Sequence, residues 1–96
     1  MPPFSVRTTA HFDRLTHKLS RHHQELADRY AQAIQILSAD PYNHARQHHI
    51  KKLEGIPSGE GQYRLSLGRW RFRYDISNRI ITLHYCGLRR EETYRR

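Results

Sequence analysis

Two runs in which polar and apolar residues alternate, 62–67 and 70–74, constrain the fold of this chain more than any other feature. The large apolar side chains are Tyr63, Leu65 and Leu67 in the first run and Trp70, Phe72 and Tyr74 in the second. A period of two is typical of β-strands that bury one face and expose the other. Gly68-Arg69, between the two runs, fits a two-residue turn with glycine first. The segment therefore predicts a β-hairpin with one aromatic face.

A third strand is predicted after a turn at Ser77-Asn78. Its apolar side is expected to carry Ile81, Leu83 and Tyr85. The polar face of the three strands then carries Arg64, Ser66, Arg71, Arg73, Thr82 and His84. A guanidinium binds phosphate through two hydrogen bonds and stays charged, so this cluster could stabilise the charge on a phosphorane as RNA is cleaved. Exposed arginine is also common on one-sided sheets, and that alternative stays open.

The first half of the chain predicts a short strand and two helices. Residues 4–9 alternate as an edge strand does, and the first helix follows with Thr8 or Thr9 as its N-cap. A second, longer helix follows Ser20 and stops at Asp40-Pro41, because the residue before proline disfavours helical geometry. The two helices are expected to form an antiparallel hairpin covering the aromatic face. For residues 42–61 no structure is assigned, although Lys51-Lys52-Leu53 could begin a strand. The predicted class is α+β, ending in a three-stranded antiparallel meander.

Length and charge limit the classes of function. A chain of 96 residues predicts one domain over residues 1–96 and excludes a multidomain enzyme with its own cofactor domain. Lys and Arg number 17 against 9 Asp and Glu, a net charge of +8. Residues 62–96 hold 9 basic and 3 acidic side chains, which is six of those eight charges. This asymmetry favours nucleic acid as the partner, and it also suits an acidic protein.

Cysteine and histidine usage bears on location and metal binding. Cys86 is the single cysteine, so neither an internal disulfide nor a cysteine zinc site is possible. With no signal peptide and no long apolar run, a reducing cytoplasmic location and no membrane span are expected. His44 and His48 are four residues apart, and His22-His23 lie on the second predicted helix. Two ligands on one helical face make only half a zinc site, so no metal is expected.

Several short motifs together resemble the RelE/ParE superfamily of bacterial type II toxins. They are Lys52-Leu53, Gly55, Tyr63-Arg64-Leu65, Leu67-Gly68, Trp70-Arg71-Phe72, Tyr74, Gly87-Leu88-Arg89 and Tyr94. Element order and length match over nearly the whole chain, and the spacing is more similar to the RelE branch than to the ParE branch. The RelE branch implies a ribosome-dependent endoribonuclease that cuts messenger RNA in the decoding site by 2′-OH attack on the adjacent phosphate. The resemblance implies no metal or other cofactor.

The resemblance also implies roles for individual residues. Arg64 matches a basic residue of the second strand, Arg71 the arginine acting on the transition state, and Arg89 a carboxy-terminal arginine. Tyr94 matches a tyrosine that stacks on a base. The interval from Arg89 to Tyr94 departs from the family pattern, so Arg90 is an alternative match. Further RNA contacts are expected from Lys51, Lys52, Arg69, Arg73 and Arg90.

The general base is the second departure from the family. The family places a second basic residue where this chain has Ser66, and serine cannot hold a proton at neutral pH. His84 is the candidate instead, because strand parity places it beside the arginines and histidine titrates near working pH. His48 and His49 are weaker alternatives.

The resemblance implies partners as well as a reaction. A cognate antitoxin would bind the chain as a hetero-oligomer, and the ribosome and messenger RNA would be its targets. A ParE-like DNA gyrase inhibitor without catalytic activity is the alternative function, favoured by Ser66 and opposed by Arg89 with Tyr94. A member that keeps the fold and has lost activity is a third hypothesis.

Overall fold

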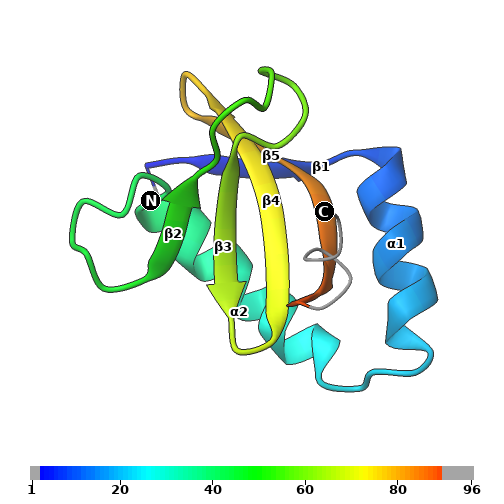
Figure 1. The fold of residues 1–96 in the computed structure, drawn as a ribbon. Coiled ribbons are helices and arrows are strands. Elements are labelled where there is room, and N and C mark those ends of the chain that lie inside the picture. The colour runs from blue at the N-terminus through cyan, green and yellow to red at the C-terminus, as the bar shows by residue number, and fades with distance from the viewer. Residues whose placement is uncertain (1–2, 90–96) are drawn as a thin grey trace.

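The computed structural model describes residues 3–89, in which two helices accompany five strands (Figure 1). The elements are β1 (Ser5–Thr8), α1 (Ala10–Ser20), α2 (Leu26–Ala39), β2 (His49–Lys52), β3 (Tyr63–Leu67), β4 (Trp70–Ser77) and β5 (Ile80–Leu88). Strand, two helices and then a run of strands is the predicted order. The α+β class is therefore confirmed.

The five strands form one sheet in the order β1-β5-β4-β3-β2. Strands β2 to β5 are antiparallel to their neighbours, while β1 joins the edge of β5 in parallel. The predicted three-stranded meander is confirmed as β3, β4 and β5, and β2, which begins at His49, adds a fourth antiparallel strand in the segment that was left without assigned structure. In β2 only Ile50 is partly buried, opposite Leu65, and one inward residue leaves almost no alternation to detect.

Helix α1 begins where capping predicts and α2 ends where proline predicts, but α2 begins at Leu26 without a side-chain cap, later than the expected start after Ser20. Thr9 caps α1, its Oγ1 accepting a hydrogen bond of 3.0 Å from the backbone N–H of Phe12. Helix α2 ends at Ala39, before Pro41. The helices meet where the rings of Phe12 and Tyr30 lie 5.4 Å apart, edge to face. Figure 1 shows α1 beside β5 and α2 crossing behind the strands, so the helical pair packs chiefly on the sheet.

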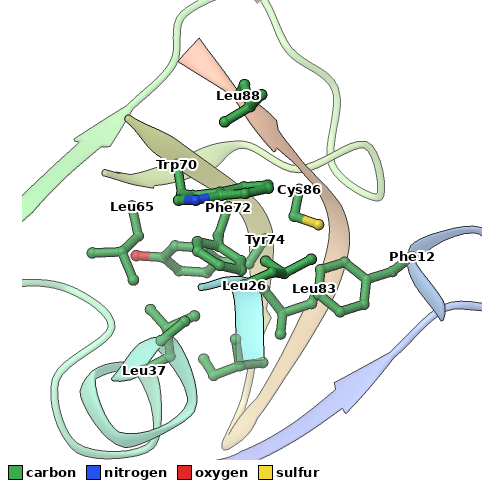
Figure 2. Packing of buried hydrophobic residues seen from close by; sticks show 12 residues of the cluster. Phe12, Leu26, Leu37, Leu65, Trp70, Phe72, Tyr74, Leu83, Cys86 and Leu88 are labelled. Carbon is green, nitrogen blue, oxygen red and sulfur yellow. The ribbon is translucent and has the colours of Figure 1, made fainter. Parts of the chain in front are cut away.

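The core lies between α2 and the aromatic face of the sheet (Figure 2). Trp70, Phe72 and Tyr74 of β4 occupy its centre and are at most 1% exposed. Around them pack Phe12, Leu26, Leu37, Leu65, Leu83, Cys86 and Leu88. The hydroxyl of Tyr74 donates a 2.7 Å hydrogen bond to the backbone carbonyl of Pro41, which ties the segment after α2 to the sheet. The opposite face of the sheet is left to polar residues.

A β-bulge in β5 changes which residues reach each face. Tyr74 pairs with Leu83, but the next residue of β4 toward the turn, Arg73, pairs with Tyr85, so His84 is the extra residue. Beyond the bulge Cys86 takes the core position and is fully buried. The prediction that Tyr85 belongs to the apolar side was therefore wrong. Alternation assumes a regular ladder, and an inserted residue reverses the parity of everything after it.

Candidate functional site

Two rows of residues cross the polar face of the sheet. Residues directly opposite one another on antiparallel strands point to the same face. The first row is Lys51, Arg64, Arg73 and Tyr85, and the second is His49, Ser66, Arg71 and Gly87. We call this surface the arginine face and define it by Lys51, Arg64, Ser66, Arg71, Arg73 and Tyr85. The structure thus brings together the four hairpin residues that the sequence placed on one face.

Two arginines of this face are fixed by backbone carbonyls. The Nε of Arg73 donates to the carbonyl of Gly61 at 3.2 Å, and its Nη2 donates to that of Glu60 at 3.1 Å. The Nη1 of Arg71 donates to the carbonyls of Gly68, at 2.8 Å, and of Trp70, at 3.0 Å. Their guanidinium groups are held in place before any anion arrives, as electrostatic stabilisation of a developing charge requires.

His84 pairs with a buried carboxylate beside the arginine face. Its Nε2 lies 2.8 Å from Oδ2 of Asp75, and the two side chains are 22% and 11% exposed. The same Oδ2 accepts the backbone N–H of Gly61 at 3.0 Å, and Oδ1 accepts that of Gln62 at 3.0 Å. Sequence reasoning missed Asp75, although alternation places it on the same side as Arg73. Its burial depends on the loop before β3, which spacing does not predict.

Tyr85 is the second residue that sequence reasoning missed. The ring lies over Gly87, since a Cβ atom built there would collide with the ring's hydroxyl end. Tyr85 stands opposite Arg73 and is partly buried. A tyrosine ring on an open basic sheet can stack on a nucleobase. Only the bulge puts Tyr85 here, and nothing in the sequence marks the bulge.

Two of the expected RNA-binding residues lie away from the arginine face. Lys52 is on the opposite side of β2, with its Nζ 5.7 Å from the centroid of the Tyr63 ring. The Nη2 of Arg69 donates to Oε2 of Glu25 at 3.2 Å, at the start of α2. A backbone hydrogen bond, then bonds from Arg69 and Trp70, hold the pKa of Glu25 below its ordinary value. Arg69 is therefore engaged with a helix rather than with the face.

The remaining candidates fall at the margins of the site or beyond it. Arg89 directly follows β5, where its backbone N–H donates to the carbonyl of Arg69 at 2.7 Å. Thr82 pairs with Asp75, and His49 pairs with Ser66. The backbone of His48 is held by the side chain of Asn43. Two further candidates, Arg90 and Tyr94, lie outside the described residues.

Within residues 3–89, no three His, Cys, Asp or Glu side chains are grouped so that they could hold a metal ion. In the same part of the chain, neither helix has the length and apolar character needed to cross a membrane.

The strand order, the helices on one side and the open basic face on the other define a RelE-like α+β fold. No protein-family model and no curated protein sequence matches the chain. Among solved structures, it is similar to a chain of the crystal structure of the archaeal RelE–RelB complex from Pyrococcus horikoshii OT3. The two share 21% sequence identity at a TM-score of 0.66, over 91% of this chain and 96% of that chain. At 21% sequence identity, this structural likeness establishes the fold alone.

Proposed function

We propose that this protein is the toxin of a type II toxin–antitoxin system and acts as a ribosome-dependent messenger RNA endoribonuclease. The observation that carries this proposal is the first cross-strand row, which sets Lys51, Arg64 and Arg73 side by side next to Tyr85 on a RelE-like sheet. Like charges directly opposite one another on a sheet oppose folding. A phosphate backbone lying across the row relieves that repulsion and gains charge-assisted hydrogen bonds.

The proposed reaction needs a base and stabilisation of negative charge. A ring nitrogen of His84 takes the proton from a ribose 2′-OH, and the oxygen attacks the adjacent phosphorus. The bond from phosphorus to the 5′ oxygen breaks, and that oxygen takes a proton from water, leaving a 2′,3′-cyclic phosphate and a 5′-hydroxyl. Arg64 and Arg71 stabilise the phosphorane charge. Tyr85 supplies a ring for base stacking, in addition to Tyr94, to which the family resemblance assigns that role. Arg89 keeps the role of the carboxy-terminal arginine that the same resemblance implies.

An antitoxin is the proposed protein partner. The similar solved structure is a RelE–RelB complex, which supports a protein that binds this chain. The net charge of +8 suits an antitoxin segment that is acidic or amphipathic, wrapping the helices and covering the arginine face.

Inhibition of DNA gyrase is the second candidate function. Ser66 favours it, since it occupies the second row between His49 and Arg71, where the RelE pattern has a basic residue. In that case the arginine face binds a protein and performs no chemistry.

Controlled expression in a bacterium without the antitoxin separates the two functions. Amino-acid and thymidine incorporation are followed together, and the 5′ ends of a reporter message are mapped. We expect protein synthesis to stop first, with new cuts inside translated codons. Arg71→Ala should lower cleavage by ~100- to 1,000-fold, as loss of one donor to a transition-state oxyanion does. Arg14→Ala removes the same charge from an exposed position on α1 and should cleave like the wild type.

Two results would contradict the proposal. Arrest of DNA synthesis first, with intact message, supports gyrase inhibition instead. Full cleavage by a folded Arg71→Ala protein removes the catalytic assignment of Arg71. Thermal unfolding of each variant shows whether it is folded, which matters because Arg71 also bonds two backbone carbonyls near the turn between β3 and β4.

A further inference from the structure

Asp75 is the one buried charged residue among residues 3–89, with 8% of the whole residue exposed. Burying a carboxylate costs free energy unless donors satisfy both of its oxygens. Here the backbone N–H groups of Gly61 and Gln62 and the Nε2 of His84 surround it at 2.8 to 3.0 Å. The two loop amides give each oxygen one donor, and the contact with His84 adds a second partner to Oδ2.

The contact determines which nitrogen of His84 is basic. A neutral imidazole carries its proton on one nitrogen and a lone pair on the other. An ionised carboxylate only accepts hydrogen bonds, so the Nε2 facing Asp75 must carry the proton. Nδ1 then holds the lone pair, on a residue that directly precedes Tyr85 of the arginine face.

We propose that Asp75 is a positioning residue that holds His84 in the Nε2–H form, with Nδ1 as the base. This inference rests on the proposed function, in which His84 takes the 2′ proton. Asp75 also stabilises the imidazolium formed when Nδ1 accepts that proton, because its charge lies 2.8 Å from Nε2–H. The same carboxylate braces the backbone at Gly61 and Gln62, so one residue fixes both the base and the loop beside it.

Asp75→Asn tests the inference because its amide is nearly the same size as the carboxylate. The amide has one oxygen, so it cannot accept from both the Gly61 and Gln62 N–H groups and from His84 as well. With its NH₂ toward His84, it donates to Nε2 and forces the proton onto Nδ1. The ring then turns a donor toward the substrate instead of a lone pair.

Gly61→Ala is the matched control for the loop. Gly61 has a φ of +84°, and a Cβ there would lie 3.0 Å from the Cβ of Arg73. The substitution disturbs the loop at the atoms that Asp75 braces, yet it leaves the side chains of Asp75 and His84 in place. A loss caused only by a loosened loop should appear in both variants.

The first measurement is the ring ¹⁵N spectrum of His84 in the full chain, followed with rising pH until it no longer changes, so that the neutral ring is the form observed. We expect the Nε2–H form in the wild type and in Gly61→Ala, and the Nδ1–H form in Asp75→Asn. The Nδ1–H form in the wild type would overturn the inference. This measurement needs no catalysis, so it tests the hold of Asp75 on His84 even if the chain cleaves no RNA.

The second measurement is a double-mutant cycle on cleavage of ribosome-bound message. Asp75→Asn should lose ~100- to 1,000-fold, within the range of about 100- to 10,000-fold that general-base catalysis contributes. In a His84→Gln background the same substitution should cost less than about threefold, because Asp75 acts through a residue already absent. An equal loss in both backgrounds would assign Asp75 to the loop alone and refute the positioning role. If the wild type itself cleaves nothing, the proposed function fails, and the ¹⁵N spectrum alone decides whether Asp75 sets the tautomer.

Discussion

Tyr74→Phe offers a direct test of how the helical layer is fastened to the sheet. The side chain of Tyr74 is fully buried, and its hydroxyl is 2.7 Å from the carbonyl oxygen of Pro41, which is itself buried. Phenylalanine preserves the ring, its packing in the core and its stacking on Tyr63, whose ring centroid is 5.5 Å away. What disappears is one hydroxyl, leaving a buried acceptor without its partner.

The expected cost follows from that single bond. An unsatisfied buried acceptor costs about 1–3 kcal/mol, and the rigid ring gives the site little freedom to relax. For a chain of 96 residues, a loss of about 2 kcal/mol lowers the melting temperature by roughly 8–16 °C. Urea and thermal unfolding monitored by circular dichroism measure both quantities. Tyr42→Phe, at a tyrosine that is 46% exposed, is the control and should change stability by less than about 0.5 kcal/mol.

The difference between wild type and Tyr74→Phe should shrink at alkaline pH. Burial, and then the nearby Tyr63 and Asp40, raise the pKa of Tyr74 far above its ordinary value of 10.0. The unfolded chain therefore releases this proton above about pH 10 while the folded chain keeps it, so the wild type loses unfolding free energy as the pH rises. Phenylalanine has no such proton, so the gap between the two proteins should narrow by roughly 1 kcal/mol near pH 11. A gap that stays constant from pH 8 to pH 11, or one below about 0.5 kcal/mol at pH 8, would refute the reasoning.

Two further predictions concern residues of strand β5. Gly87→Ala should keep the fold but displace the Tyr85 ring, so cleavage should fall ~5- to 150-fold, to the level of Tyr85→Ala. Tyr85→Phe keeps the ring and should remain active. Full activity of Gly87→Ala would exclude stacking by Tyr85. Burial raises the pKa of the Cys86 thiol from 9.0 to about 12, so at neutral pH iodoacetamide should label the folded chain far more slowly than the denatured chain, as mass spectrometry can measure. Equal labelling rates would show that the core around Cys86 opens readily.

Much of the fold follows from local signals in the sequence. The alternation around Gly68-Arg69 gave the β3–β4 hairpin, whose turn requires the positive φ of 62° that glycine adopts without strain. The Thr9 cap and the stop before Pro41 likewise depend only on neighbouring residues. Strand β2 and the parallel pairing of β1 depend on contacts with distant strands, which local periodicity does not encode.

In the candidate site, too, some positions follow from local sequence patterns and others do not. Parity alone placed Arg64, Arg71 and Arg73 on one face, because β3 and β4 form a regular ladder. The bulge at His84 breaks the ladder between β4 and β5, so the position of Tyr85 could not be predicted. Parity also places His84 and Asp75 on this face, but the burial of Asp75 depends on the loop before β3, which parity does not predict. Residues fixed by register were predictable, whereas residues fixed by an irregularity were not.

Gly61 links the arginine face to the proposed base. Its carbonyl accepts from Arg73 and its N–H donates to Asp75, so two opposite charges on β4 hold the two peptide groups that flank this one residue. Removing Arg73 therefore loosens the loop that Asp75 braces, and through Asp75 it can disturb His84. A loss of activity in Arg73→Ala would not by itself demonstrate contact with RNA. Lys51 is exposed on the same row, so the salt dependence of RNA binding in Lys51→Ala is a cleaner measure of phosphate contact at this face.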